Sequence, residues 1–218
     1  MKESDMYPIL RDYLESRGYS VYAEVEPRQV LNHYGRADII AYSKPAVCIV
    51  EMKTSLSIDL IEQAYRWIPY VHYIYVAVPK RKKPIPTFVR KMLSQFKIGI
   101  LEVDQRWGSV HTTLLARFNR PHVKIDWDKE LLPQHQTWAP GGSTSDSGYV
   151  TPYKLTIERV TYLLKRNPHR WFSIREILDY CETHYKNPKS SLANALMKYE
   201  SDTFECKIID GVLKFRLR

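Results

Sequence analysis

The sequence of 218 residues has little of what marks secreted, disulfide-rich or membrane proteins. Its three cysteines, Cys48, Cys181 and Cys206, are widely separated, which argues against a disulfide framework or a zinc cluster and favours a reducing compartment. It has no apolar run of about 18 residues, so no membrane-spanning helix is predicted. The N-terminus is charged from Lys2 onward and lacks a signal-peptide pattern. We therefore expect a soluble, cytoplasmic protein without a membrane partner.

The sequence does have a surplus of positive charge. It contains 33 lysines and arginines against 24 aspartates and glutamates, which gives a formal net charge of +9. This balance suits a polyanionic partner, but many basic proteins bind no nucleic acid. With 44% hydrophobic residues, the chain can bury a core, and its length allows one or two domains.

An apolar run over residues 47–50 leads directly into Glu51, Met52 and Lys53. A short apolar run that begins after a proline, here Pro45, predicts a strand covered on both faces. Because side chains alternate along a strand, Glu51 and Lys53 point to one face, roughly 6.6 Å apart, while Met52 points to the other. An acidic and a basic side chain are therefore expected together at the end of a buried strand.

A second short strand is predicted over residues 35–41 and contains Asp38. The short link between the two strands makes them natural antiparallel neighbours, which would place Asp38 beside Glu51. Hard oxygen ligands of this kind hold Mg²⁺ or Mn²⁺ next to a phosphodiester, and the Lys53 ammonium can stabilise charge or orient an attacking water. The alternative is a solvated Glu–Lys pair at the edge of an ordinary sheet. The strand context favours a metal site with Asp38 and Glu51 as ligands.

The other predicted elements follow the order of a compact α/β domain with a mixed sheet. Three helices are expected, over residues 4–17, 57–68 and 87–95. Six strands are expected, over residues 19–25, 35–41, 47–53, 72–78, 97–103 and 110–115. In the first helix, Ser4 or Asp5 should be the N-cap, and Pro8 is tolerable only in the first turn. The apolar faces of the second and third helices should bury Ile58, Ile61, Ala64, Tyr65, Ile68, Phe88, Met92 and Phe96.

Three more polar residues lie near the candidate site in this arrangement. Glu3, at the start of the first helix, either supports the site or interacts favourably with the helix dipole. Gln63, on the second helix, is either a site residue or a solvated surface residue. Glu24, on the first strand, either reaches the site or faces water.

A basic turn follows the strand predicted over residues 72–78. Adjacent cations in a loop are usually just solvated, but beside a carboxylate–metal site they can hold the phosphates of a bound duplex. The candidate DNA-binding residues of this turn are Lys80, Arg81, Lys82 and Lys83.

The last third of the chain changes character. Prolines and the Gly- and Ser-rich segment 141–148 predict that residues 119–150 form a linker, or a loop draped over a first domain of residues 1–118. Residues 151–218 then predict three short helices and a hairpin around Asp210-Gly211, an arrangement typical of a winged helix-turn-helix domain. Its third helix, over residues 187–199, would be of the recognition type, and residues 204–217 would be the wing.

The predicted winged helix is itself basic. Residues 150–218 contain 13 lysines and arginines and 8 aspartates and glutamates, a difference of +5. DNA contact is favoured over protein interaction, which winged helices also mediate. Its candidate DNA-binding residues are Lys186, Lys189, Lys198, Lys207 and Lys214.

The pattern D-x12-E-x-K resembles the core of the PD-(D/E)XK nuclease superfamily. The wider chain resembles a bacterial family of PD-(D/E)XK-like phosphodiesterases of unknown function. The segments that carry this resemblance are Glu3-Ser4-Asp5-Met6-Tyr7-Pro8, the strand from Gly18 to Glu24, Ala37-Asp38-Ile39-Ile40-Ala41, Val50-Glu51-Met52-Lys53, Gln63-Ala64, Val76-Ala77-Val78-Pro79, Pro140-Gly141-Gly142-Ser143-Thr144 and Thr151-Pro152-Tyr153-Lys154. The loop over residues 26–35 is longer than the family pattern, which leaves open whether Glu24 reaches the metal.

The resemblance implies a restriction-endonuclease-like core, with a central mixed sheet flanked by helices. It also implies metal carboxylates at Asp38 and Glu51, a catalytic Lys53, and Glu3 and Gln63 as supporting catalytic residues. The resulting expectation is a Mg²⁺- or Mn²⁺-dependent DNA endonuclease whose winged helix recruits DNA, acting as a homodimer or in a larger nucleoprotein assembly. The alternatives are a catalytically inactive, nuclease-like DNA-binding or regulatory protein, or a nuclease subunit of a transposition or defence assembly.

Overall fold

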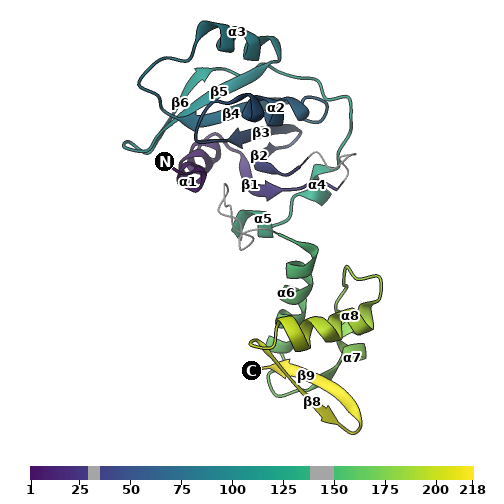
Figure 1. Cartoon of the computed structure of the whole chain (residues 1–218). Coiled ribbons are helices and arrows are strands. Elements are labelled where there is room, and N and C mark those ends of the chain that lie inside the picture. The colour runs from purple at the N-terminus through teal and green to yellow at the C-terminus, as the bar shows by residue number, and fades with distance from the viewer. Residues whose placement is uncertain (29–34, 138–149) are drawn as a thin grey trace. The chain divides into compact units, whose positions relative to one another are not determined.

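A computed structural model describes residues 1–28, 35–137 and 150–218. The chain divides into two compact units, Met1–Val150 and Thr151–Arg218. The first unit contains α1 (Glu3–Glu15), β1 (Ser20–Val25), β2 (Ala37–Ser43), β3 (Ala46–Met52), α2 (Ile58–Arg66), β4 (Tyr73–Pro79), α3 (Thr87–Gln95), β5 (Ile98–Asp104), β6 (Ser109–Leu114), α4 (Trp127–Glu130) and α5 (Gln134–Thr137) (Figure 1). None of the helices in the described ranges is long and apolar enough to cross a membrane.

The first unit is built on a six-stranded sheet with the order β1-β2-β3-β4-β5-β6. Strands β3, β4 and β5 are parallel, and the other neighbours are antiparallel. The predicted α/β class with a mixed sheet is therefore confirmed. Because parallel strands run in one direction, the carboxyl ends of β3, β4 and β5 meet at the same edge of the sheet.

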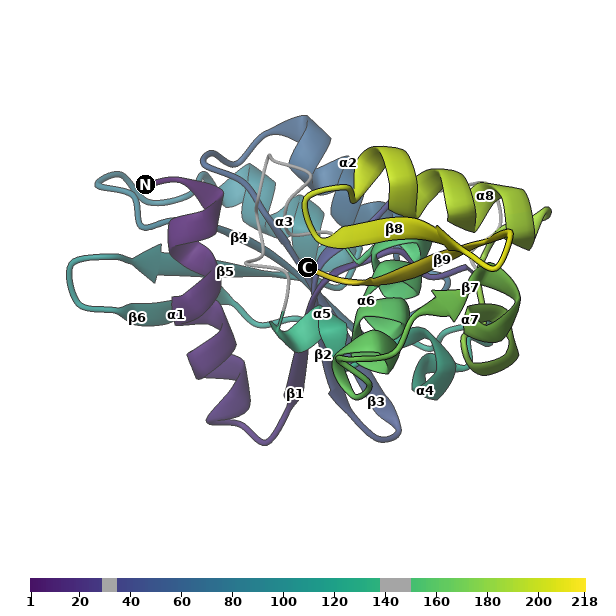
Figure 2. The ribbon, with the colours of Figure 1, turned by 90° about the horizontal axis from the view of Figure 1, so that it is seen from below.

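Helices cover both faces of this sheet, with α1 on one face and α2 and α3 on the other (Figures 1 and 2). On the α1 side, Met6 and Leu10 pack against Val50 of β3. On the other side, Leu60 and Trp67 pack against Ile49. The two faces of β3 are thus buried, as the apolar run predicted.

The start of α1 differs from the prediction. The helix begins at Glu3 with Lys2 as its N-cap, because the Asp5 carboxylate accepts the Lys2 backbone N–H (2.8 Å). Pro8 consequently lies in the second turn rather than the first. A proline there cannot donate to the carbonyl of Ser4, a loss that the burial of Met6, Leu10 and Leu14 offsets.

The predicted inward faces of α2 and α3 are also partly wrong. On α2 the core side is formed by Leu60 and Ala64, whereas Ile58 is 81% exposed. On α3 only Leu93 is fully buried, and Phe88 is 75% exposed. On each helix, packing against the sheet buries an apolar stripe that differs in part from the predicted one.

Within the first unit, residues 119–137 pack against the sheet and its helices. Trp127 and Leu131 are buried in the same core as α2, and the Arg28 backbone N–H donates to Glu130 (2.9 Å). This stretch, which the sequence predicted as a linker or a draped loop, packs on the sheet domain. Residues 138–149 of that prediction lie outside the described residues.

The second unit contains α6 (Pro152–Lys165), β7 (Phe172–Ser173), α7 (Ile174–Tyr180), α8 (Pro188–Asn194), the π-helical turn η2 (Ala195–Tyr199), β8 (Phe204–Ile209) and β9 (Val212–Leu217). Its sheet has the order β7-β9-β8. The predicted capping box of Ser173 and Glu176 opens α7. The predicted Asp210-Gly211 turn joins β8 to β9, with positive φ at both residues. A separate core around Val160, Phe172, Leu192 and Phe215 holds this unit together.

Candidate functional site

Asp38 and Glu51 come together where β2 begins and β3 ends. The antiparallel register pairs Ile39 with Val50. Asp38 precedes Ile39 and Glu51 follows Val50, so the two carboxyl groups lie side by side. The Met52 backbone N–H donates to Asp38 Oδ2 (2.7 Å), and the Trp67 indole N–H donates to Glu51 Oε1 (2.6 Å). The predicted juxtaposition of the two carboxyls is therefore present, and each group is oriented by a donor from the surrounding fold.

The two carboxyl groups are strongly coupled. Burial, opposed by the hydrogen bond from Met52 and reinforced by the charge of Glu24, raises the pKa of Asp38 to about 6. Burial and the neighbouring Asp38 raise the pKa of Glu51 well above its usual value. The two side chains can hydrogen-bond to each other only when one of them carries a proton, because ionised carboxylates only accept. The site therefore resists carrying two negative charges unless a cation is supplied.

Glu24 is the third acidic residue at this site. Its side chain is 2% exposed and lies 2.5 Å from the Arg36 guanidinium. The negative charge of Glu24 raises the pKa of both Asp38 and Glu51, so Glu24 acts on the pair electrostatically. Its backbone has a φ of +54°, a conformation that is rare for a residue other than glycine and recurs at functional sites.

Lys53 directly follows β3 and remains attached to the sheet. Its backbone N–H donates to the Ala77 carbonyl (3.1 Å), and its Nζ lies 3.6 Å from Asp59 Oδ2 at the start of α2. The Lys53 side chain is 30% exposed, so it can be reached by a ligand. Lys53 thus stands next to the carboxyl pair but interacts with a different carboxylate in this structure.

The two residues predicted to support the site, Glu3 and Gln63, differ in their relation to the carboxyl pair. Glu3 is the first residue of α1, and its charge contributes to raising the pKa of Asp38. Gln63 is half-buried on α2. The hydrogen bond from the α2 region to Glu51 comes instead from Trp67, one turn later.

Sequence reasoning missed Trp67. It is 2% exposed and is the C-cap of α2. The signal that could have found it is the spacing Leu60, Ala64, Trp67, which marks a second apolar stripe on this helix. A large aromatic ring with one N–H on such a stripe needs an acceptor when it is buried.

The donor chemistry of the site fits a hard divalent cation. Oxygen ligands from carboxylates suit Mg²⁺ or Mn²⁺, and a cation would replace the shared proton of Asp38 and Glu51. Across the three described stretches, no three His, Cys, Asp or Glu side chains form a group that could hold a metal. Two protein carboxylates are sufficient for Mg²⁺, which usually keeps several waters and often binds substrate phosphates.

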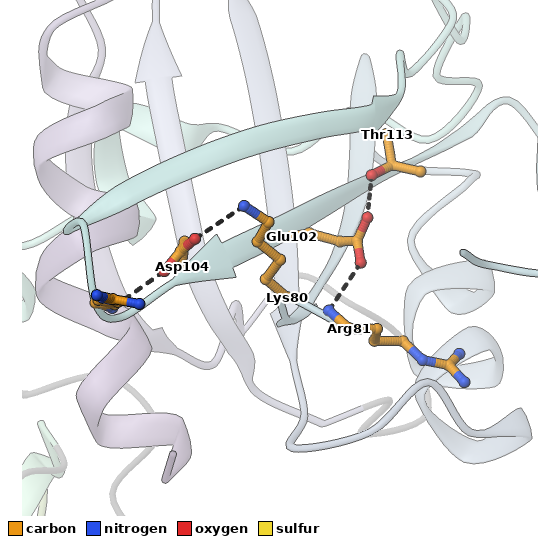
Figure 3. A network of polar contacts seen from close by, with 6 residues as sticks. Lys80, Arg81, Glu102, Asp104 and Thr113 are labelled. Carbon is orange, nitrogen blue, oxygen red and sulfur yellow. Dashed lines mark hydrogen bonds and ion pairs between the residues drawn. The ribbon is translucent and has the colours of Figure 1, made fainter. Parts of the chain in front are cut away.

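The basic turn lies at the same edge of the sheet, after β4. The Lys80 backbone N–H donates to the Val103 carbonyl (2.8 Å), and its Nζ lies 2.9 Å from Asp104 (Figure 3). The Arg81 backbone N–H donates to Glu102 (3.2 Å). Arg81, Lys82 and Lys83 are exposed, so the turn is fixed through its backbone and Lys80 while its remaining cations face outward.

In the second unit the predicted cations lie on α8, η2 and the hairpin or next to them. Lys186, Lys189 and Lys198 are exposed. Lys207 of β8 is directly opposite Lys214 of β9. Like charges at opposed positions of an antiparallel pair destabilise it, so this pair suits a surface that binds anions.

No protein-family model and no curated protein matches the chain. Among solved structures, the chain is similar to an XisH family protein from Nostoc punctiforme PCC 73102, with a TM-score of 0.37 and 14% sequence identity. The match covers 53% of this chain and 99% of that one. A similarity of this size identifies neither a family nor an activity, and the resemblance to PD-(D/E)XK phosphodiesterases stays a prediction from the sequence.

Proposed function

We propose that the chain is a metal-dependent DNA endonuclease that hydrolyses phosphodiester bonds at Asp38 and Glu51. The observation that carries the proposal is the buried pair of neighbouring carboxyl groups, both with raised pKa values, at the carboxyl edge of a mixed sheet. Keeping two acids so close is costly in the absence of a cation. The carboxyl edge of an open α/β sheet is also where such folds usually bind ligands.

Each residue of the site has a distinct part in this proposal. Asp38 and Glu51 would hold Mg²⁺ or Mn²⁺, which when bound would neutralise phosphate charge and lower the pKa of a bound water. Trp67 keeps the Glu51 carboxyl in place, and the Met52 N–H does the same for Asp38. Lys53 would leave Asp59 and stabilise negative charge on the phosphoryl oxygens or orient the attacking water. Glu3 and Gln63 remain supporting residues.

The basic side chains would bind the phosphates of the DNA backbone. The turn of Lys80, Arg81, Lys82 and Lys83 lies on the same edge as the carboxyl pair, where it can contact phosphates next to the cleaved bond. We propose that residues 151–218 form a winged helix, which the order of three helices and a terminal hairpin supports. In it, the region of α8 and η2 and the Lys207–Lys214 pair would recruit duplex DNA.

Two observations favour a second function. Lys53 is directed to Asp59, and the described residues contain no cluster of three potential metal ligands. A nuclease-like core that has become a DNA-binding or regulatory element would tolerate both. A nuclease subunit that is completed only within a homodimer or a larger transposition or defence assembly would as well.

A cleavage assay tests the proposal most directly. The purified chain is incubated with Mg²⁺ or Mn²⁺ and supercoiled, linear, branched or single-stranded DNA, with Glu51→Gln as the matched control. Metal-dependent cleavage by the wild type and its loss in the variant would support the endonuclease. Binding without cleavage of any of the four substrates would favour the regulatory alternative.

A further inference from the structure

The first unit contains a cavity of about 500 Å³ at the opposite end of the strands from Asp38 and Glu51. Tyr42, which lines it, pairs with Val47 near the start of β3, and His72 precedes β4. The volume is within the usual range for a small-molecule site. Its lining includes five ring side chains, Tyr42, Tyr70, His72, Phe118 and Trp127.

The wall of this cavity around Phe118 is held rigidly. The adjacent Asn119 is buried, and its amide donates to the carbonyls of Ile68 and Val71 (2.9 Å for Val71). Its backbone N–H donates to the His72 carbonyl (2.8 Å). Despite these anchors at the adjacent residue, the Phe118 side chain is 56% exposed. A large apolar ring held firmly on the surface is pre-organised for contact with a ligand.

The Phe118 ring is part of an aromatic group. Its centroid lies 5.9 Å from that of His72 and 6.0 Å from that of Tyr73. The His72 Nδ1 accepts the Val47 backbone N–H (3.2 Å), and burial lowers the pKa of His72. The imidazole is therefore a neutral part of the wall at pH 7, with its proton on Nε2.

Around the cavity, the acidic side chains have partners of opposite charge, but two of the basic side chains differ. Asp128 accepts hydrogen bonds from Tyr42 (2.9 Å) and Lys44 (2.5 Å). Asp126 lies 2.7 Å from Lys129. Within the described part of the chain, Arg120 and Lys124 line the cavity without a carboxylate partner. The carboxylates are thus neutralised, and two cations are left for an anion.

We infer that this cavity binds a nucleotide, with the base against Phe118 and the phosphate at Arg120 and Lys124. The two requirements for such a ligand, a stacking surface and a positive charge beside it, are the ones that nucleotide-binding surfaces combine. The nucleotide could be a free mononucleotide or the end of a nucleic-acid strand. This site is separate from the proposed catalytic site and does not depend on hydrolysis.

Calorimetric titration of the full chain in EDTA with dAMP tests this inference. Phe118→Ala should weaken dAMP binding about tenfold, the scale of one lost stacking contact, and Lys124→Glu should weaken it at least as much because it places a negative charge beside the phosphate. The matched controls are Phe88→Ala and Lys91→Glu, which remove an exposed ring and reverse an exposed cation on α3. Both controls should bind dAMP like the wild type. Thermal melting checks that all four variants are folded.

Further titrations distinguish a free mononucleotide from the end of a nucleic-acid strand and define the results that would overturn the inference. A 5′-phosphorylated single-stranded oligonucleotide that binds when dAMP does not would identify a strand end as the ligand, provided that Phe118→Ala and Arg120→Glu weaken it. Because these titrations are run in EDTA, the cavity can be tested even if the chain is no nuclease. The inference is overturned if neither probe binds, if the cavity variants bind like the controls, or if inorganic phosphate binds as tightly as dAMP.

Discussion

Two buried glutamates at one edge of the same sheet have opposite surroundings. Glu51, at the end of β3, is 3% exposed, and Glu102, near the end of β5, is 8% exposed. Glu102 accepts the Arg81 N–H through one oxygen and the Thr113 hydroxyl through the other (Figure 3). Glu51 accepts one donor, Trp67, and faces the carboxyl group of Asp38.

The difference shows what distinguishes a site from a structural contact. Burying a carboxylate is tolerable when both of its oxygens accept hydrogen bonds, as those of Glu102 do. Glu102 thereby fixes the backbone of the basic turn. At Glu51 one of the partners is another acid, so the arrangement is satisfied only by a proton or a cation. The second carboxyl group, rather than burial, is the feature that points to a metal.

The largest expected effect is the loss of metal binding when either Asp38 or Glu51 is removed. We expect Asp38→Ala and Glu51→Ala each to abolish measurable Mn²⁺ binding, because both carboxylates are needed as ligands, and to leave the fold intact. Calorimetric titration with Mn²⁺ measures this. Glu102→Ala is the matched control, since it removes a glutamate from the same edge and should retain binding. Wild-type affinity in both acid-pair variants would refute the metal assignment.

Replacing Lys53 should have the next largest effect, on cleavage alone. Lys53→Met keeps most of the side-chain volume and removes the charge, and a protonated amine cannot ligate a metal. Metal and DNA binding should therefore survive, while cleavage should fall at least about a hundredfold. Wild type and variant are compared at equal metal and DNA occupancy, with Lys91→Met as the control. Equal cleavage rates would remove Lys53 from the mechanism.

Neutral replacements should change stability in opposite directions at the two glutamate sites. The pKa of Asp38 is about 6 in the folded state, above its ordinary value of 3.8, so the folded chain loses stability as the pH rises between these values. Asp38→Asn should therefore be more stable than the wild type at pH 8 without metal, by about 1–3 kcal/mol, and equally stable near pH 4. Glu102→Gln should be less stable by about 1 kcal/mol, because it puts a donor where an acceptor is needed.

Chemical denaturation in EDTA at several pH values measures both changes. The same experiment with saturating Mn²⁺ sharpens the contrast, since the ion should stabilise the wild type and Glu102→Gln and have little effect on Asp38→Asn. A loss of stability in Asp38→Asn at pH 8 would mean that the acid pair is a structural contact like that of Glu102.

The acid pair could be predicted because its geometry is local. Only a short turn separates β2 from β3, so the hydrophobic alternation of the two strands fixes their register and places Asp38 beside Glu51. Trp67 and Glu24 could not be predicted in the same way. The phase of α2 depends on which of two apolar stripes meets the sheet, and the position of Glu24 depends on a left-handed backbone conformation that no local residue type demands.

Elsewhere in the chain, too, features set by neighbouring residues could be predicted, whereas features assembled from distant segments could not. The Asp210-Gly211 turn and the Ser173 capping box are local signals, and both are present. The cavity beside Phe118 is assembled from segments far apart in the sequence, including Tyr42, Tyr70 and Trp127. Its existence follows from the sheet order and from Asn119, whose three hydrogen bonds join distant segments.

The smallest expected effect is on the salt dependence of DNA binding by the second unit. It tests whether the cations of this unit contact phosphates, as we propose for the basic turn of the first unit. The fragment 151–218 has its own buried core, so we expect it to fold alone and to bind duplex DNA with an affinity that falls steeply with salt. Lys207→Ala and Lys214→Ala should each lower the slope of log affinity against log salt by about 1, because each removes one phosphate contact. Fluorescence anisotropy with a labelled duplex measures the slopes, and Lys165→Ala, at the end of α6, is the control. A fragment without affinity for duplex at low salt would identify this unit as a protein-interaction module. Unchanged slopes in both hairpin variants would instead move the DNA contact away from the opposed lysines, toward the cations near α8 and η2.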